Sequence, residues 1–426
     1  MAQQHSNTGK MKKNTLLVIL ILVIFFVISF LTNILGPIIP DIIESFDLSI
    51  GLAGFLPFSF FVAYGVMSIP SGILVEKYKE KKVMVAAFLL AFVGAFLFAL
   101  VPSFPVALTS LFIIGIGMAM LQVVINPLLR TAGGEEHFAF NSVFGQLAFG
   151  AASFLSPLLY SYLVLNIHTE NSSPLIDLFN GLVPEGLRWV SLYWVFAAIA
   201  LVMTLIVYLV KFPQVELKEE EKVDTGKAFK ELLGNRYVLL FFLGIMCYVG
   251  TEQGVANWAS KFLQIYHGID PATTGAKVIS NFWGLLTLGC LLGLALLKFF
   301  DSRHVLIVFT SGAIISLLLA LFGSADMAVM AFPAVGFFAS VMWSIIVSLA
   351  LNSVRWHHGT FSGILCTGIA GGAVAPLIIG GLAEIIGLRF AMLFLLLTLG
   401  YILSVGVWAR PLVTNARVKK LRELVK

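Results

Sequence analysis

Long apolar runs separated by short polar segments make up most of this chain. Residues 16–35 and 83–101 are continuous apolar stretches, and neither shows the period-two alternation of a membrane β-strand. A helical span needs roughly 20 apolar residues to cross about 30 Å of hydrocarbon, and a lipid-exposed backbone must satisfy its own hydrogen bonds. The pattern therefore predicts an all-α polytopic membrane protein.

Glycine, proline and charged residues divide the chain into twelve expected transmembrane helices. In the first half we expect spans at residues 15–38, 50–75, 83–101, 105–129, 138–164 and 190–210. In the second half we expect them at residues 237–260, 278–297, 304–323, 327–354, 360–383 and 390–409.

The longest charged segment, residues 211–236, lies between the two halves and is too polar to enter the bilayer. Weak similarity between the halves, such as Phe25-Phe26 and Phe241-Phe242, is typical of repeats within one transporter. We therefore expect two six-helix bundles, residues 15–210 and 237–410, joined by residues 211–236 as a cytoplasmic linker. Residues 1–14 and 411–426 are expected to be cytoplasmic tails.

The distribution of basic residues between alternate loops predicts the orientation. All but four of the 27 Lys and Arg residues fall on one side of the expected spans; the four on the other side are Arg188, Lys261, Lys277 and Arg389. Cytoplasmic loops carry an excess of Lys and Arg, so we expect both termini in the cytoplasm and a multi-pass protein of the inner membrane. The net charge of +5 reflects this loop bias and does not indicate nucleic-acid binding.

Composition narrows the class of protein further. With 59% hydrophobic and 12% charged residues, the chain is too apolar for a soluble domain, and the lipid bilayer is its expected solvent. It contains no Walker loop, nucleophile elbow or metal-ligand spacing. We therefore expect neither an enzyme nor a cofactor or metal site.

Several short motifs stand out along the chain: residues 72–81 between spans 2 and 3, Asn126-Pro127, Tyr248 to Glu252, Trp283-Gly284, Leu349 to Leu351, and residues 362–373. In order and spacing they resemble the major facilitator superfamily and, within it, the fucose:proton symporter family of bacterial sugar permeases. The resemblance implies the major facilitator fold and alternating access to a sugar site. It also implies that the loop with Gly72, Glu76 and Lys77 latches the inner gate.

The chain departs from the family pattern at four positions. Lys79 replaces the second glycine of the loop signature, and Gly36 and Gln122 stand where the family has acidic residues in spans 1 and 4. Ala339 replaces a polar Asn of span 10.

Glu252 is the ionisable residue that the expected spans place at depth, between Gly250 and Gly254 in span 7. A carboxylate near the bilayer centre is costly and usually faces a wet cavity. The two glycines are expected to let the helix bend or open there. Glu252 is predicted to bind a proton or a sodium ion, or to accept hydrogen bonds from sugar hydroxyls. The alternative is a carboxyl that serves helix packing.

Amide side chains are the second candidate group. Gln122 and Asn126 are four residues apart on one face of span 4, and neutral amides both donate to and accept from sugar hydroxyls. Further amides at comparable depth are Asn33, Asn141, Gln146, Gln253, Asn257 and Asn281. The alternative for each is an interhelical hydrogen bond, which is common in membrane bundles.

Trp283 and Trp343 are the third candidate group, because an indole face stacks on a pyranose while its N–H binds a hydroxyl. Packing or interfacial anchoring is the alternative. Taken together, these residues predict a monomeric secondary transporter that moves a sugar or similar polar solute, coupled to protons or sodium. A uniporter of the same fold, a drug or lipid exporter and a sugar sensor stay open.

Overall fold

The computed structural model describes residues 15–133, 138–169, 173–212, 227–354 and 358–412, and helices dominate this part of the chain. Twelve segments within it are long and apolar enough to cross a membrane. The predicted number of spans is therefore confirmed. Some boundaries are wrong, most clearly for the first span, which extends to Ser45 and not to residue 38.

The first half contains six spans in chain order. Their helices are α1 (Thr15–Thr32) with α2 (Leu35–Ser45), α3 (Ile50–Ala53) with α4 (Phe55–Tyr78), α5 (Glu80–Leu100), α6 (Phe104–Gly133), α7 (Phe138–Asn166), and the short η2 (Glu185–Val190) with α9 (Ser191–Leu209). The short helix α8 (Pro174–Leu182) lies in the loop before η2.

The second half also contains six spans, which follow α10 (Lys227–Leu233). Its helices are α11 (Arg236–His267), η4 (Pro271–Gly275) with α12 (Ala276–Phe299), α13 (Ser302–Phe322), α14 (Ala325–Ala339) with α15 (Met342–Leu351), α16 (His358–Thr367) with η5 (Gly368–Ala370) and α17 (Gly371–Ile386), and α18 (Leu388–Ala391) with α19 (Phe394–Trp408).

A break at Asn33 and Ile34 divides the first span into α1 and α2. Pro37 lies four residues after Asn33. In a continuous helix, its ring would clash with the Asn33 carbonyl group, and it has no N–H to donate to that group. The helix therefore stops at this carbonyl and restarts at Leu35, where Pro37 falls in the first turn. This break places Asn33 at a point where the regular backbone is interrupted.

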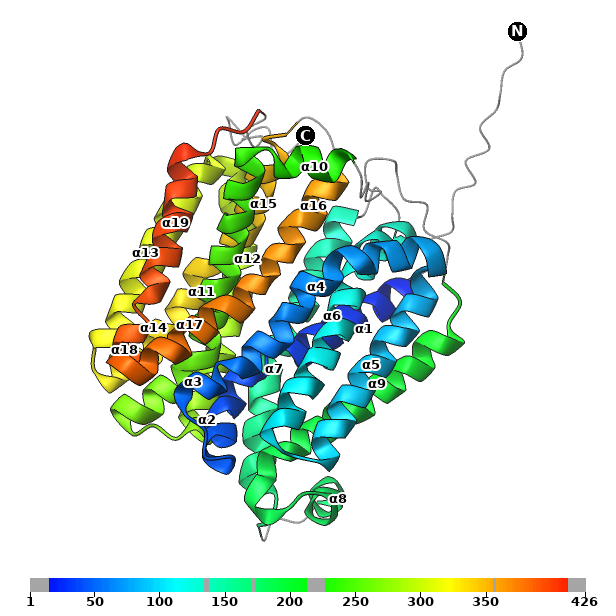
Figure 1. Ribbon diagram of the computed structural model, residues 1–426, viewed down its shortest axis with the longest axis vertical. Coiled ribbons are helices and arrows are strands. Elements are labelled where there is room, and N and C mark those ends of the chain that lie inside the picture. Colours follow the sequence, from blue (N-terminus) through cyan, green and yellow to red (C-terminus); the bar gives the residue numbers. More distant parts are fainter. Residues whose placement is uncertain (1–14, 134–137, 170–172, 213–226, 355–357, 413–426) are drawn as a thin grey trace.

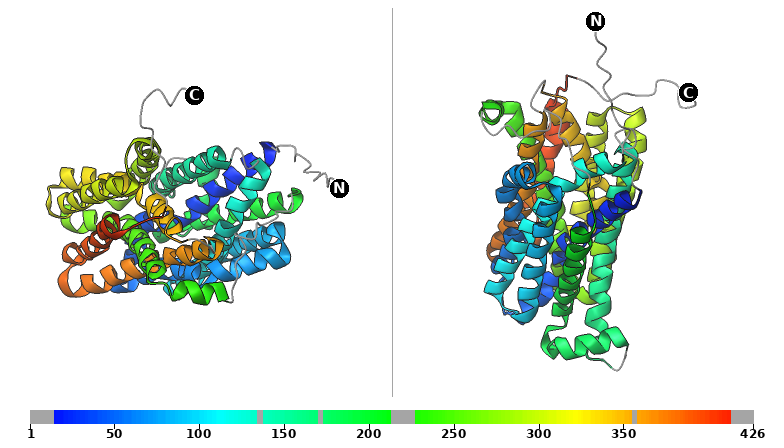
Figure 2. Two further views of the ribbon diagram at one scale, coloured as in Figure 1. Left: turned by 90° about the horizontal axis from the view of Figure 1, so that it is seen from above. Right: turned by 90° about the vertical axis from the view of Figure 1, so that its right-hand side faces the viewer.

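Each half forms one bundle, and the two bundles lie side by side (Figures 1 and 2). In the first bundle α6 packs against α4 and α5, and α1 packs against α7; in the second, α14 packs against α12 and α13. The bundles meet along several helix pairs, among them α2 with α11, α3 and α4 with α17, and α7 with α12. The all-α arrangement of two six-helix bundles expected from the sequence is confirmed.

The two ends of the molecule are distinguished by short helices (Figure 1). Helix α8 lies at one end, together with α2, α3 and α18, and α10 lies at the opposite end. We call these the α8 end and the α10 end. Helix α10 falls within the predicted linker, residues 211–236, whose residues 213–226 lie outside the described part of the chain. The linker and tail boundaries stay predictions.

Candidate functional site

Glu252 is half-buried on α11, and both oxygens of its carboxylate accept hydrogen bonds from that helix. The Tyr248 hydroxyl, one turn earlier, donates to Oε2 at 2.5 Å, and Nε2 of the buried Gln253 donates to Oε1 at 3.2 Å. Asn257 then donates from Nδ2 to Oε1 of Gln253 at 3.2 Å. Four polar side chains of α11 thus form one connected group, three of them among the predicted site residues.

Asn33 joins this group from the opposite bundle. Its Oδ1 accepts a hydrogen bond from Nε2 of Gln253 at 3.3 Å. Its Nδ2 donates to the Ser153 hydroxyl at 2.9 Å and to the Ser29 hydroxyl at 3.4 Å, and the Ser29 hydroxyl donates to the backbone carbonyl of Phe149 at 2.6 Å. The helix break therefore presents an oriented amide to α11, and the predicted residues Asn33, Gln253, Glu252 and Asn257 are brought together.

The close approach of α2 and α11 depends on Gly36. A Cβ atom at position 36 would lie 2.0 Å from the backbone oxygen of Ala256. No side chain fits there while the bundles are in contact, so an acidic residue at this position is incompatible with the conformation described. The exchange of acid for glycine in span 1 has a steric consequence as well as an electrostatic one.

Gly250 and Gly254 do not open the seventh span, contrary to the expectation from the sequence. Helix α11 runs unbroken from Arg236 to His267. A Cβ at Gly250 would lie 3.0 Å from Cβ of Ala375, and one at Gly254 would lie 2.7 Å from Cδ2 of Leu395. These glycines instead allow α17 and α19 to pack closely against the helix that carries Glu252.

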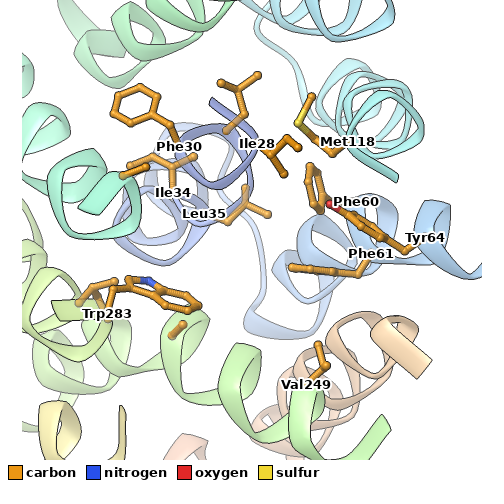
Figure 3. Close-up of a cluster of buried hydrophobic side chains, with 14 of the residues drawn as sticks. Ile28, Phe30, Ile34, Leu35, Phe60, Phe61, Tyr64, Met118, Val249 and Trp283 are labelled. Atoms are coloured by element: carbon orange, nitrogen blue, oxygen red, sulfur yellow. The ribbon is translucent and has the colours of Figure 1, made fainter. Parts of the chain in front are cut away.

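Aromatic side chains border the polar group. The ring centre of Trp343, on α15, lies 6.0 Å from that of Tyr248. Since the Tyr248 hydroxyl binds Glu252, this predicted tryptophan contacts a direct partner of the carboxylate. Trp283, on α12, is buried, and its indole N–H finds no hydrogen-bond acceptor among the described residues. Figure 3 shows Trp283 in a buried cluster that also contains Ile34 and Leu35 at the helix break.

The predicted amides of span 4 are described only in part. Gln122 is half-buried and lies one turn from Met118, which belongs to the cluster of Figure 3. The side chain of Asn126 lies outside the described part, although its backbone belongs to α6. Whether these two amides face Glu252 or Trp283 across a cavity stays a prediction.

Three predicted amides are not brought to this group. Asn141 lies near the α10 end, because its Nδ2 would be 2.1 Å from a Cβ at Gly133, the last residue of α6. Gln146 and Asn281 are exposed. Asn281 lines a mostly apolar hollow of about 480 Å³ between α7 and α12, whereas Trp283, two residues later, lies on the other face of the helix.

The predicted gating loop connects α4 and α5. Gly72 and the exposed Lys77 belong to the end of α4, and the Lys77 ammonium lies 5.2 Å from the centre of the Tyr78 ring; the side chain of Glu76 lies outside the described part. Lys79, which replaces the signature glycine, has φ 72° and ψ 160°. This backbone conformation is nearly restricted to glycine.

Two carboxylates at the α8 end were missed by the sequence reasoning. Asp41 accepts a hydrogen bond from the buried Tyr160 hydroxyl at 2.6 Å, and it interacts electrostatically with Lys261 of the other bundle. Glu384 of α17 accepts a hydrogen bond from the backbone N–H of Gly51 at 2.9 Å, also across the bundles. A longer first span, which its apolar residues after Pro37 allow, would have drawn attention to Asp41.

The described residues contain no group of three or more His, Cys, Asp and Glu side chains that would hold a metal ion. The arrangement at Glu252 is suited to a different task. It offers one carboxylate and several amides that donate and accept. Trp283, beside the helix break, adds a buried indole N–H that finds no acceptor among the described residues. These groups match a polyhydroxylated solute together with a single proton or monovalent cation.

Comparison with known proteins supports the fold described above, two bundles of six transmembrane helices. The family description of the Major Facilitator Superfamily matches residues 21–365. The chain is 29% identical over 387 residues to a glucose/galactose transporter of Brucella abortus biovar 1 (strain 9-941), covering 89% of this chain and 90% of the relative. It is 23% identical over 374 residues to the L-fucose-proton symporter of Escherichia coli (strain K12), covering 83% and 84%.

A solved structure shows the same fold. The outward-facing Major Facilitator Superfamily transporter FucP superposes with a TM-score of 0.66 at 21% identity, covering 92% of this chain and 98% of that one.

Proposed function

The chain belongs to the Major Facilitator Superfamily, and from this premise we propose that it carries a sugar, most specifically a hexose, across a bacterial cytoplasmic membrane by alternating access. The observation that carries the proposal is the polar group around Glu252, which lies where the two bundles meet and uses side chains from both. Named relatives that transport glucose, galactose or fucose support the choice of substrate class.

Glu252 is the proposed coupling residue. In the described bundles it has two hydrogen-bond donors and no cationic partner among the groups that act on it. A carboxylate without a fixed counter-charge in a membrane interior binds a proton or sodium ion at little structural cost, because the ion removes an unfavourable charge. Loading with a cation and a sugar would then precede reorientation of the bundles.

Trp283 and the amides are the proposed sugar-recognition groups. The buried indole N–H of Trp283 finds no acceptor among the described residues, and a sugar hydroxyl would supply one. Gln253, Asn257 and Asn33 carry both donors and acceptors next to Glu252. Gln122 and Asn126 are proposed to contribute from span 4, and the exposed Gln146 to lie along the path of the sugar. Asn141 and Asn281 are outside the proposed site.

The proposed orientation rests on the distribution of charge. Lys77, Lys79, Lys81 and Lys82 lie at the turn between α4 and α5, whereas Arg188, Lys261, Lys277 and Arg389 are the basic residues of the opposite side. We place the α10 end and both termini in the cytoplasm and the α8 end outside. The outer ends of the bundles are then in contact, as the hydrogen bond from Gly51 to Glu384 indicates. The proposed unit is one chain.

A uniporter of the same fold is the second candidate, and one observation favours it. Both oxygens of Glu252 already accept hydrogen bonds from side chains of its own helix, so each oxygen has a donor without a bound cation. The two candidates differ in what happens when a gradient is imposed.

Uptake into reconstituted vesicles tests the proposal. D-glucose, D-galactose and L-fucose are offered as labelled substrates under an inward proton or sodium gradient, with and without an ionophore that collapses it. A symporter accumulates one of them above the external concentration and loses this accumulation with the ionophore. A uniporter only equilibrates it. Absence of uptake for all three sugars would contradict the substrate class.

A further inference from the structure

We infer that Gln253 is the positioning residue through which contact between the two bundles controls proton release from Glu252. This inference rests on the proposed function, since it assigns Glu252 as the coupling carboxylate. The feature that carries it is a single amide group. Nε2 of Gln253 donates to Glu252 at 3.2 Å and to Asn33 of the opposite bundle at 3.3 Å, and an NH₂ group has one hydrogen for each.

The orientation of both amides follows from their other partners. Asn33 directs its Nδ2 to the hydroxyls of Ser153 and Ser29, so its oxygen faces Gln253. Asn257 directs its own Nδ2 to the oxygen of Gln253, so the nitrogen of Gln253 faces Glu252 and Asn33. Each donor in the series therefore meets an acceptor, and no step requires the amides to be reversed.

Packing holds this amide in place. Gln253 is buried, and a Cβ at Gly372 of α17 would lie 3.1 Å from its Cγ and 2.9 Å from the ring of Phe61 of α4. The Gln253 stem and the Phe61 ring thus both lie against Gly372, where α17 meets α4 of the opposite bundle. When the bundles separate at this level, Gln253 loses its hydrogen bond to Asn33.

A hydrogen bond to the ionised carboxylate lowers its proton affinity. If this bond is held in only one conformation of the carrier, the proton affinity of Glu252 differs between the conformations. While the bundles are closed around Gln253, its N–H favours ionised Glu252 and therefore proton release. When they part, the amide is free to turn away and Glu252 retains a proton more readily. A proton would thus be captured with the α8 end open and released with it closed.

The other titratable groups that face Glu252 do not provide this asymmetry. Tyr248 belongs to the same helix and moves with it. The Cys290 thiol of α12, close enough to interact with the Glu252 charge, belongs to the same bundle. From α2, α14, α15, α17 and α19, no charged side chain among the described residues acts on Glu252. Gln253 is the member of the group that bonds both to Glu252 and across the bundles.

Infrared titration of the purified carrier in lipid tests this inference without any substrate. The carbonyl band of protonated Glu252 is identified by its loss in Glu252→Gln and followed as the pH is raised. Gln253→Met keeps the length of the side chain but removes the donor. We expect its band to persist to a pH about one unit higher than in the unmodified protein, a tenfold change in proton affinity.

Two further variants separate positioning from general perturbation. Asn33→Leu should shift the titration in the same direction, and adding it to Gln253→Met should cause no further shift, because both act on one bond. The matched control is Gln264→Met on the same helix, where the amide accepts from Lys261 and not from the network; it should titrate like the unmodified protein.

The inference is overturned if Gln253→Met titrates like the unmodified carrier, or if Asn33→Leu leaves the titration unchanged. A Glu252 band that is absent at every pH also overturns it. Failure of sugar uptake, in contrast, would count against the proposed substrate and leave the titration result standing. If Gln253→Met does not fold, Asn33→Leu alone tests the inference, because the inference requires that this variant also shifts the Glu252 titration to higher pH.

Discussion

Nε2 of Gln253 lies 3.3 Å from Oδ1 of Asn33, and the two residues belong to different bundles. The same nitrogen lies 3.2 Å from the carboxylate of Glu252. The proposed coupling carboxylate and a contact between the two bundles are therefore separated by one amide. Transport coupling requires that each depends on the other, and these hydrogen bonds provide a short physical route for that dependence.

Removing the charge of Glu252 should separate exchange from accumulation. Glu252→Gln keeps the shape of the side chain and most of its hydrogen bonds, but it no longer gains or loses a proton. We expect concentrative uptake to be lost, while exchange of sugar between preloaded vesicles continues, because exchange does not require the empty carrier to return. Labelled-sugar flux in both assays measures this. Accumulation against a gradient by the variant would place coupling elsewhere; loss of both fluxes would indicate a recognition or structural role.

Trp283→Ala should weaken sugar binding by roughly 1 kcal/mol, the scale of one aromatic contact. The prediction depends on the buried indole N–H, which finds no acceptor among the described residues. Titration calorimetry or substrate protection against labelling measures the affinity. Trp258→Phe is the control, because the Trp258 indole already donates to the Pro376 carbonyl at 3.0 Å and is fully buried in the second bundle. It should lower thermal stability and leave affinity unchanged. If Trp283→Ala and the unmodified carrier bind sugar with equal affinity, Trp283 serves helix packing and does not contact the sugar.

Much of the fold was predictable from the sequence because hydropathy and loop charge are properties of short segments. The helix break at Asn33 was not predicted. Its cause, Pro37, is local, but prolines are also tolerated inside α4, α6, α7 and α17. Proline alone therefore does not say which helix will stop.

The site was only partly predictable, because the direction of a side chain depends on tertiary packing. Trp283 and Asn281 are two residues apart in an apolar helix, and the sequence does not say which of them is buried with Ile34 and Leu35 at the helix break. Gly250 and Gly254 illustrate the same limit. A glycine that permits bending and one that permits close packing look identical in sequence, and here α17 and α19 occupy the space.

Lys79→Gly should stabilise the carrier by about 1 kcal/mol. Lys79 has φ 72° and ψ 160°, a conformation that costs a residue with a Cβ of order 1–3 kcal/mol and costs glycine little. The measurement is the apparent thermal unfolding midpoint of purified protein in detergent. Lys82→Gly is the matched control, since it removes the same charge from the first turn of α5, where glycine is unfavourable by up to about 1 kcal/mol. A midpoint lowered equally in both variants would show that the lost charge, and not backbone strain, decides the result.

Glu384→Ala should make the α8 end open more often. Oε1 of Glu384 accepts a hydrogen bond from the backbone N–H of Gly51 at 2.9 Å, and this contact joins α17 to the helices of the opposite bundle. An exposed hydrogen bond to a charged group contributes roughly 1 kcal/mol, so its loss should raise the population of the open state about fivefold.

The measurement uses Leu377→Cys, in a background without the three native cysteines, because the Leu377 backbone packs against Gly54 between the bundles. The rate at which a membrane-impermeant maleimide labels this cysteine from outside should rise by a similar factor. Glu185→Ala removes an exposed glutamate at the same end of the first bundle and should leave the rate unchanged. An equal increase in both variants, or none in Glu384→Ala, would show that this hydrogen bond does not help to hold the α8 end closed.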